Sequence, residues 1–331
     1  MSRTARLALA LPFLALLAAA PARAYEPPRT PDGRPDLQGI WTNASITRLT
    51  RPEGVKKLVL TPQEAAIFER TSRYNVAKAR DAQASDPNEG APTDGNTDAG
   101  YNAFWIDPGS KAGLVKGEYR TSWIVDPPDG QIPRGAGARK VIAAMIGNRR
   151  NYDGPETRPV GERCLIGFGG TGGPGMLNVL YNNTYQIVQT GDHVMILVEM
   201  VHDARIVRMG GEHLPPAITP WLGDSVGHWD GDTLVVETTQ VNPVQGRQGF
   251  ILLTPKGKVT ERFTRYSDDQ IFYSFTVEDP ELYTRPWTAE MSFNATKGPV
   301  YEYACHEGNY ALPGVLEGAR AEEKKQASAK P

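Results

Sequence analysis

The stretch from Tyr181 to Thr239 restricts the possible fold more than any other part of the sequence. It holds three runs rich in Val, Ile, Thr and Tyr, and each run is bounded by Gly, Asp, Asn or Pro. This composition and these boundaries are typical of β-strands. The runs are residues 185–188, 193–201 and 233–239. The first two are separated by Gly191-Asp192, a spacing that favours a hairpin.

Strand-like segments continue towards the C-terminus. Residues 258–266, 270–277, 287–293 and 300–305 alternate apolar and polar side chains, and turn residues separate them. Short strands at even spacing predict a mainly β chain folded as an antiparallel β-barrel. Near the N-terminus, Gly39-Ile40-Trp41 is similar to the Gly-x-Trp signature of lipocalins. We therefore expect a lipocalin-like barrel built from residues 37–60 and 119–310, with helical and loop insertions.

The first 24 residues have the features of a secretory signal peptide. Arg3 and Arg6 precede an apolar run, and Ala22-Arg23-Ala24 matches a cleavage site. The mature chain is then expected to begin at Tyr25, in the periplasm or outside the cell. No later stretch has the roughly 20 apolar residues needed to span a membrane. We expect one β-rich domain over residues 25–316, with an insertion at about 61–118, and a disordered tail over 317–331.

The charge balance argues against nucleic acid or an anionic membrane surface as partner. The chain has 36 Lys and Arg against 38 Asp and Glu, a formal net charge of −2. Removing the signal peptide takes away three arginines and no acid, which leaves 33 basic against 38 acidic residues, or −5. A nucleic-acid-binding protein usually carries a basic surplus.

Two helices and one unusual loop are expected within the β-rich chain. Thr61-Pro62-Gln63-Glu64 forms a capping box that should start a helix running to about Ala79. A second helix is expected over 136–147. Residues 167–175 are glycine-rich, but no Lys-Ser/Thr follows them, so a phosphate loop is excluded. A flexible lid or connector is the remaining interpretation.

Cys164 and Cys305 are the only cysteines. In an exported protein a pair of cysteines favours a disulfide over two free thiols or a catalytic thiol. The bond would hold the C-terminal segment Cys305-His306-Glu307-Gly308-Asn309 beside the middle of the chain.

Several motifs together resemble a family of exported bacterial proteins for which no activity is established. They include GERC, YNNTYQIVQT, HDARI, TERFTR, TRPWTAE and YEYACHEGNY, and they extend over most of the mature chain. The resemblance implies export and a lipocalin-like barrel, and it implies no reaction.

Two clusters of ionisable residues are candidates for catalysis. His202 follows an apolar strand and is the candidate general base, with Asp203 beside it in sequence. His306 or Glu307, next to Cys305, could act as the acid. A histidine hydrogen-bonded at the barrel rim is the alternative for His202, and closure of the barrel is the alternative for His306.

We expect the barrel to hold a small, partly apolar molecule. Aromatic side chains would line its cavity, and charged side chains would orient the ligand. The aromatic candidates are Trp41, Tyr185 and Trp287, and the charged candidates are Glu199, Arg205 and Arg262. The alternatives are a metal-free acid–base enzyme of the lyase, hydratase or isomerase type, using His202 and His306, and a structural protein of the envelope. No metal-binding spacing such as His-Glu-x-x-His is present, so we expect no metal and no cofactor.

Overall fold

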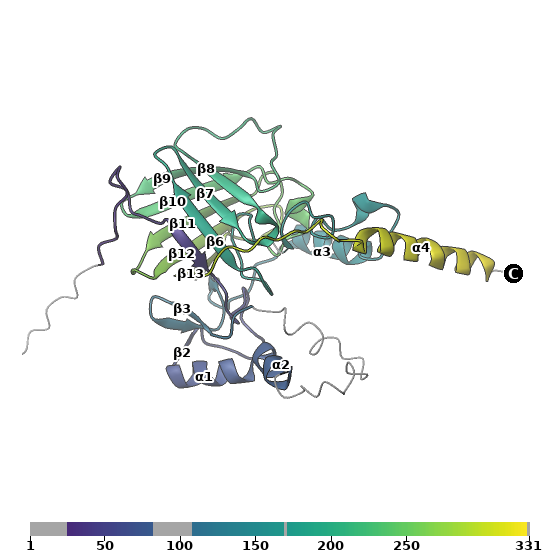
Figure 1. The fold of residues 1–331 in the computed structure, drawn as a ribbon, viewed down its shortest axis with the longest axis horizontal. Coiled ribbons are helices and arrows are strands. Elements are labelled where there is room, and N and C mark those ends of the chain that lie inside the picture. The colour runs from purple at the N-terminus through teal and green to yellow at the C-terminus, as the bar shows by residue number, and fades with distance from the viewer. Residues whose placement is uncertain (1–24, 82–107, 169–170, 330–331) are drawn as a thin grey trace, which may run out of the picture.

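A computed structural model describes residues 25–81, 108–168 and 171–329, and the expected signal peptide lies outside this range. Its centre is a closed barrel of nine strands (Figure 1). The barrel closes because β1 pairs with β6 on one side and with β13 on the other. The expected mainly β barrel with helical and loop insertions is confirmed. The strands are β1 (Gly39–Thr42), β6 (Thr184–Gln189), β7 (His193–Val198), β8 (Ala204–Met209), β9 (Asp224–Asp230), β10 (Thr233–Thr239), β11 (Lys258–Arg265), β12 (Gln270–Glu278) and β13 (Trp287–Ala295).

One pairing differs from an antiparallel barrel. β8 and β9 run parallel, whereas the other neighbouring strands around the barrel are antiparallel. Parallel neighbours need a crossover of about a dozen residues or more, and residues 210–223 provide it. Neither β8 nor β9 was expected from the sequence.

Alternation along the strands separates the inside of the barrel from its outer surface. On β12, Ile271, Tyr273 and Phe275 are buried, whereas the intervening Phe272 and Ser274 are only partly buried. Buried aromatic rings on neighbouring strands pack against one another inside the barrel, including Tyr273 on β12 with Phe293 on β13 at 5.2 Å between centroids. This aromatic packing forms the core.

A smaller sheet and two helices lie against one side of the barrel. The sheet consists of β2 (Val59–Leu60), β4 (Glu118–Arg120) and β3 (Gly113–Val115), and β5 (Ile124–Asp126) adds to β13. Helices α1 (Pro62–Thr71) and α2 (Arg73–Asp81) lie beyond this sheet (Figure 1). The capping box at Thr61 and Glu64 is present, and Ser72 separates the two helices where the sequence predicted one.

The C-terminal region departs from two expectations. Residues 300–305 form no strand; this segment is held by the hydrogen bond from Tyr301 N to Glu199 and by the disulfide at Cys305. The tail expected to be disordered over 317–331 is helical to Ser328 as part of α4 (Ala311–Ser328), since Ala, Glu and Lys favour helix. This helix projects away from the barrel (Figure 1). The expected helix at 136–147 is present as α3 (Ala136–Asn148). None of the described helices is long and apolar enough to cross a bilayer.

Candidate functional site

The barrel interior contains a buried ion pair between Arg205 on β8 and Glu261 on β11. Their side chains are 1% and 0% exposed, and both guanidinium Nη atoms donate to the carboxylate, Nη2 at 3.0 Å. Burial alone would lower the pKa of Arg205, but the Glu261 charge outweighs it and raises that pKa. Tyr273 donates to Glu261 Oε1 at 2.6 Å, and burial followed by the Glu261 charge raises the tyrosine pKa well above its usual value. The arginine therefore stays charged and the phenol stays protonated.

The chain itself fills the space beside this ion pair. Residues 171–177, which we call the glycine-rich plug, are all buried. Gly175 N donates to Glu261 Oε1 at 3.3 Å, and Met176 N donates to Tyr273 Oη at 2.9 Å. At the start of the plug, the carbonyl of Thr171 accepts from Tyr185 Oη at 3.2 Å. This part of the expected lid or connector is thus a component of the core.

The aromatic residues predicted to line a ligand cavity lie in this packed interior. Trp41, Tyr185 and Trp287 are buried to 2% exposure or less. Tyr185 packs edge-on against Phe293, and Trp287 packs edge-on against Phe275. Their neighbours are other core side chains and the glycine-rich plug.

The charged residues predicted to bind the ligand are dispersed. Arg205 forms the buried ion pair with Glu261 described above. Glu199 is buried and accepts from Tyr301 N at 3.1 Å. Arg262 lies on the outer surface of β11 and donates to Asp230 at 2.7 Å. The structure does not bring these three charges together.

The disulfide expected between Cys164 and Cys305 is present, with 5.7 Å between the Cα atoms. It holds the chain after β13 against the segment that precedes the glycine-rich plug. His202 reaches the same region, where its Nδ1 lies 3.2 Å from the carbonyl of Tyr303. The tail therefore contacts the β7–β8 connection at His202.

The candidate catalytic residues lie on this tail or in the β7–β8 connection next to it. His202 is exposed, and so are His306 and Glu307. Asp203 accepts from Gly167 N at 2.7 Å, and burial raises its pKa to about 6. In the described part of the chain, no hydrogen bond joins His202 to His306 or Glu307. The acid–base roles of these four residues stay predictions.

A different histidine forms the closest contacts with carboxylates. His213 lies in the β8–β9 crossover, with Nδ1 2.7 Å from Asp224 and Nε2 3.3 Å from Glu237. Asp224 also accepts from Arg208 at 2.8 Å and from Leu214 N at 3.0 Å. Burial would raise the pKa of Asp224, but these partners outweigh it and lower that pKa. The cluster attaches the crossover to the barrel, and within the described residues no group of side chains is suited to hold a metal.

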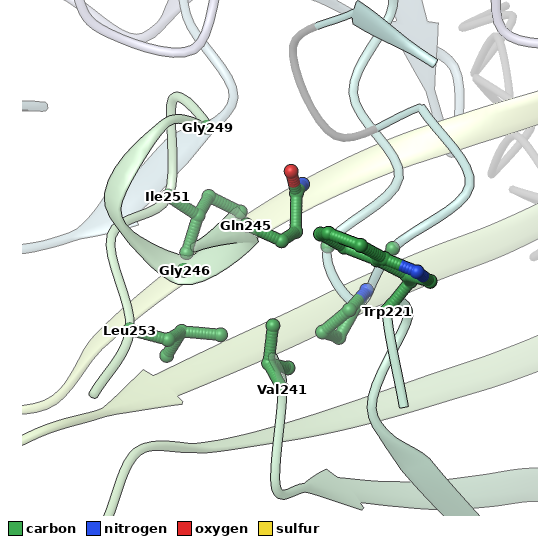
Figure 2. A pocket seen from close by; sticks show the side chains of 10 residues that line it. Trp221, Val241, Gln245, Gly246, Gly249, Ile251 and Leu253 are labelled. Carbon is green, nitrogen blue, oxygen red and sulfur yellow. The ribbon is translucent and has the colours of Figure 1, made fainter. Parts of the chain in front are cut away.

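One small cavity lies where the glycine-rich plug reaches the end of the barrel. Its volume is about 20 Å³, which is room for about one water. Figure 2 shows Trp221 on one side and residues of the 245–253 segment on the other. This mouth cavity is too small for an organic ligand.

A larger cavity, which we call the side pocket, lies outside the barrel. It has a volume of about 430 Å³ and is bordered by the segment after β1, the end of α1 and the start of α2. None of the predicted site residues lines it. Its lining residues are Ile46, Arg48, Thr50, Arg51, Pro52, Glu53, Phe68, Ser72, Arg73, Tyr74 and Thr121.

Backbone hydrogen bonds hold the walls of the side pocket in place. Ile46 N donates to Lys111 O at 3.0 Å, and Trp123 N donates to Arg48 O at 2.9 Å. The buried side chain of Arg51 donates to Pro128 O at 2.7 Å and to Lys56 O at 3.2 Å. Two features of the sequence could have indicated this pocket. Arg48 and Arg51 follow the first strand at close spacing, and Phe68 and Tyr74 lie on the apolar side of the helix predicted from Thr61 to Ala79.

No protein-family profile and no curated protein matches the sequence. Among solved structures, the chain is similar to the crystal structure of a mutant of the fluorescent protein UnaG, at 16% sequence identity. The alignment covers 39% of this chain and 84% of that chain, with a TM-score of 0.24. A likeness this weak has no bearing on ligand or activity here.

Proposed function

We propose that this chain is an exported small-molecule-binding protein whose ligand occupies the side pocket. The observation that carries the proposal is the 430 Å³ volume of that pocket, beside a barrel whose interior holds the glycine-rich plug. Pockets for small molecules usually measure about 300–1,000 Å³ and combine apolar walls with a few polar groups. The side pocket has both kinds of lining.

In this proposal the barrel acts as a rigid support. Arg51 and Thr121, two pocket-lining residues, are buried and hydrogen-bonded to neighbouring segments. Thr121 Oγ1 donates to Lys57 O at 2.8 Å, which ties the segment between β4 and β5 to the segment before α1. A pocket fixed in this way loses little conformational entropy when a ligand binds.

Export is supported by two features. The sequence begins with a signal-like leader ending at Ala24, and the disulfide between Cys164 and Cys305 is a bond that persists in oxidising compartments. N-terminal sequencing of protein secreted by an expression host is expected to give Tyr25 as the first residue. An intact leader in a cytoplasmic fraction would contradict export.

The enzyme and envelope-protein alternatives have less support. An acid–base pair must reach one substrate, yet neither described cavity is lined by His202 or His306. The hydrogen bond of His202 to a backbone carbonyl favours an anchoring role for that ring. A purely structural protein would need no side pocket.

Ligand-observed NMR against a library of small fragments tests the proposal. The wild-type chain should bind a subset of fragments, and Thr50→Trp, which places a large ring into the side pocket, should abolish that binding. Lys297→Trp, an exposed position after β13, is the matched control and should bind as wild type does. Binding that survives Thr50→Trp, or no fragment binding at all, would contradict the proposal.

A further inference from the structure

The charge lining the side pocket points to the chemistry of its ligand. Three arginines, Arg48, Arg51 and Arg73, line the pocket with one acid, Glu53. The surplus is two positive charges in a chain whose formal net charge is −2. A local surplus of the opposite sign favours an anionic ligand.

The three guanidinium groups differ in how many of their N–H donors are free to bind a ligand. Arg51 is 6% exposed, and its Nη1 donates to two backbone carbonyls. Its role is therefore to stabilise the wall of the side pocket. Arg48 is exposed, and among the described residues its guanidinium makes no hydrogen bond or ion pair. Its backbone is nevertheless fixed by the hydrogen bond from Trp123 N. Arg48 is thus a charged donor on a fixed wall, available to a ligand.

Arg73 lines the side pocket from the start of α2. Its Nη2 donates to Tyr74 Oη at 2.6 Å, and its guanidinium lies 4.7 Å from the centroid of the Tyr74 ring. This stacking orients the guanidinium and leaves further N–H donors. The first turn of α2 contains no acid, so the positive end of the helix dipole adds to the positive charge at this wall.

The remaining lining is apolar and partly aromatic. Phe68 from α1 and Tyr74 from α2 face a pocket that Ile46 and Pro52 border from the segment after β1. Aromatic side chains favour contact with another ring in an offset-stacked or edge-to-face arrangement. Carboxylates match the planar fork of a guanidinium in a bidentate geometry.

Resting on the function proposed above, we infer that the side pocket selects aromatic carboxylates. In this arrangement, Arg48 and Arg73 hold the carboxylate while Phe68 and Tyr74 contact the ring. Arg48 is the residue that determines the preference for an anion, because its guanidinium is the one least engaged by the protein itself.

Isothermal titration of the full-length mature chain with sodium benzoate and with benzamide, its neutral counterpart, tests this inference. We expect benzoate to bind about tenfold more tightly, a difference of about 1.4 kcal/mol, since hydrogen bonds to a charged acceptor are stronger than those to a neutral amide. Arg48→Ala should remove that difference and leave benzamide binding unchanged. Arg29→Ala, which removes an exposed arginine that pairs with Asp232 away from the side pocket, should retain it.

The outcomes separate this inference from the proposed function. Equal binding of benzoate and benzamide, lost in Thr50→Trp, would overturn the anion preference while the pocket remained a binding site. Fragment binding in the pocket with neither benzoate nor benzamide bound would also overturn it. A benzoate preference that persists in Arg48→Ala would remove the assignment to Arg48, and the absence of any fragment binding would remove both proposals.

Discussion

Arg205 on β8 and Glu261 on β11 meet in the barrel interior, and the backbone of the glycine-rich plug donates a further hydrogen bond to Glu261. The carboxylate accepts from the guanidinium, from Tyr273 and from Gly175 N. A position that a ligand would take in an open barrel is thus occupied by the chain. Because the chain fills the barrel interior in this way, a small-molecule ligand is expected to bind outside the barrel.

Removing one member of the buried pair should destabilise the fold strongly. Arg205→Met leaves the Glu261 carboxylate buried without its counter-charge, which typically costs about 3–5 kcal/mol. Adding Glu261→Gln should restore a substantial part of that loss, because the amide oxygen can still accept from Tyr273 and Gly175. Urea unfolding of the single and double variants measures the difference. A double variant less stable than Arg205→Met would contradict this description of the interior.

Gly175→Ala should be more costly than alanine at a glycine with open space around it. Gly175 has φ +73°, and an added Cβ would lie 2.3 Å from Ile251 Cδ1. Left-handed backbone and overpacking together should cost about 2–4 kcal/mol. Gly231, at φ +57° with no atom within 4 Å of such a Cβ, is the control, and its alanine variant should lose about 1 kcal/mol. Equal losses in urea unfolding would show that the plug is not tightly packed.

The disulfide should hold the C-terminal segment to the barrel. Cys164 and Cys305 are separated by 141 residues, and replacing both with Ser should lower the free energy of unfolding by about 2–4 kcal/mol. The tail should also become sensitive to limited proteolysis between residues 299 and 310, because the neighbouring contact of His202 with Tyr303 depends on the same placement. Unchanged proteolysis in the double Ser variant would indicate that other contacts suffice.

Strands of the barrel were predictable where the sequence pattern lies in neighbouring residues, and they were missed where the strand depends on contacts with distant residues. Alternation along β10 to β13 is a property of neighbouring residues, so these strands were found near their observed bounds. β8 and β9 were missed because they carry charged residues such as Arg205 and Asp224, which pair with residues on other segments. The strand expected at residues 300–305 does not form, and the backbone of Tyr301 and Tyr303 instead contacts the side chains of Glu199 and His202.

The candidate site was less predictable than the barrel. The glycine-rich plug makes its hydrogen bonds to Glu261 and Tyr273 through backbone atoms, and apart from Met176 and Leu177 its side chains are too small or polar to form an apolar pattern that predicts burial. The side pocket joins residues 46–53, 68–74 and 121, which only the folded chain brings together. The disulfide was predictable because two cysteines allow one pairing.

Asp203 should make stability depend on pH in the direction opposite to most carboxylates. Burial raises its pKa to about 6, above the value of about 4 in the unfolded chain. The folded state then binds more protons between pH 4 and 6, so the contribution of Asp203 to stability improves as pH falls through that window. Asp203→Asn, which can still accept from Gly167 N, should raise stability at pH 7.5 by up to about 2 kcal/mol. The gain should shrink towards pH 4 in urea unfolding.

Asp224 should make stability depend on pH in the direction opposite to Asp203, so that its contribution falls as the pH falls. Its pKa is lowered in the fold, because its hydrogen bonds and the Arg208 charge outweigh burial. Its contribution is therefore present above the unfolded pKa and is lost as pH falls through the folded pKa. Asp224→Asn should be less stable than wild type at pH 7.5, and the two should converge in acid. A variant as stable as wild type at pH 7.5 would argue against the His213–Asp224 attachment.

The most direct test of the central claim is a crystal structure of the mature chain grown with sodium benzoate. We expect density for the ring between Phe68 and Tyr74, with the carboxylate within hydrogen-bonding distance of Arg48 or Arg73 and the glycine-rich plug still in the barrel. Density for benzoate inside the barrel beside Arg205, with residues 171–177 displaced, would contradict the account.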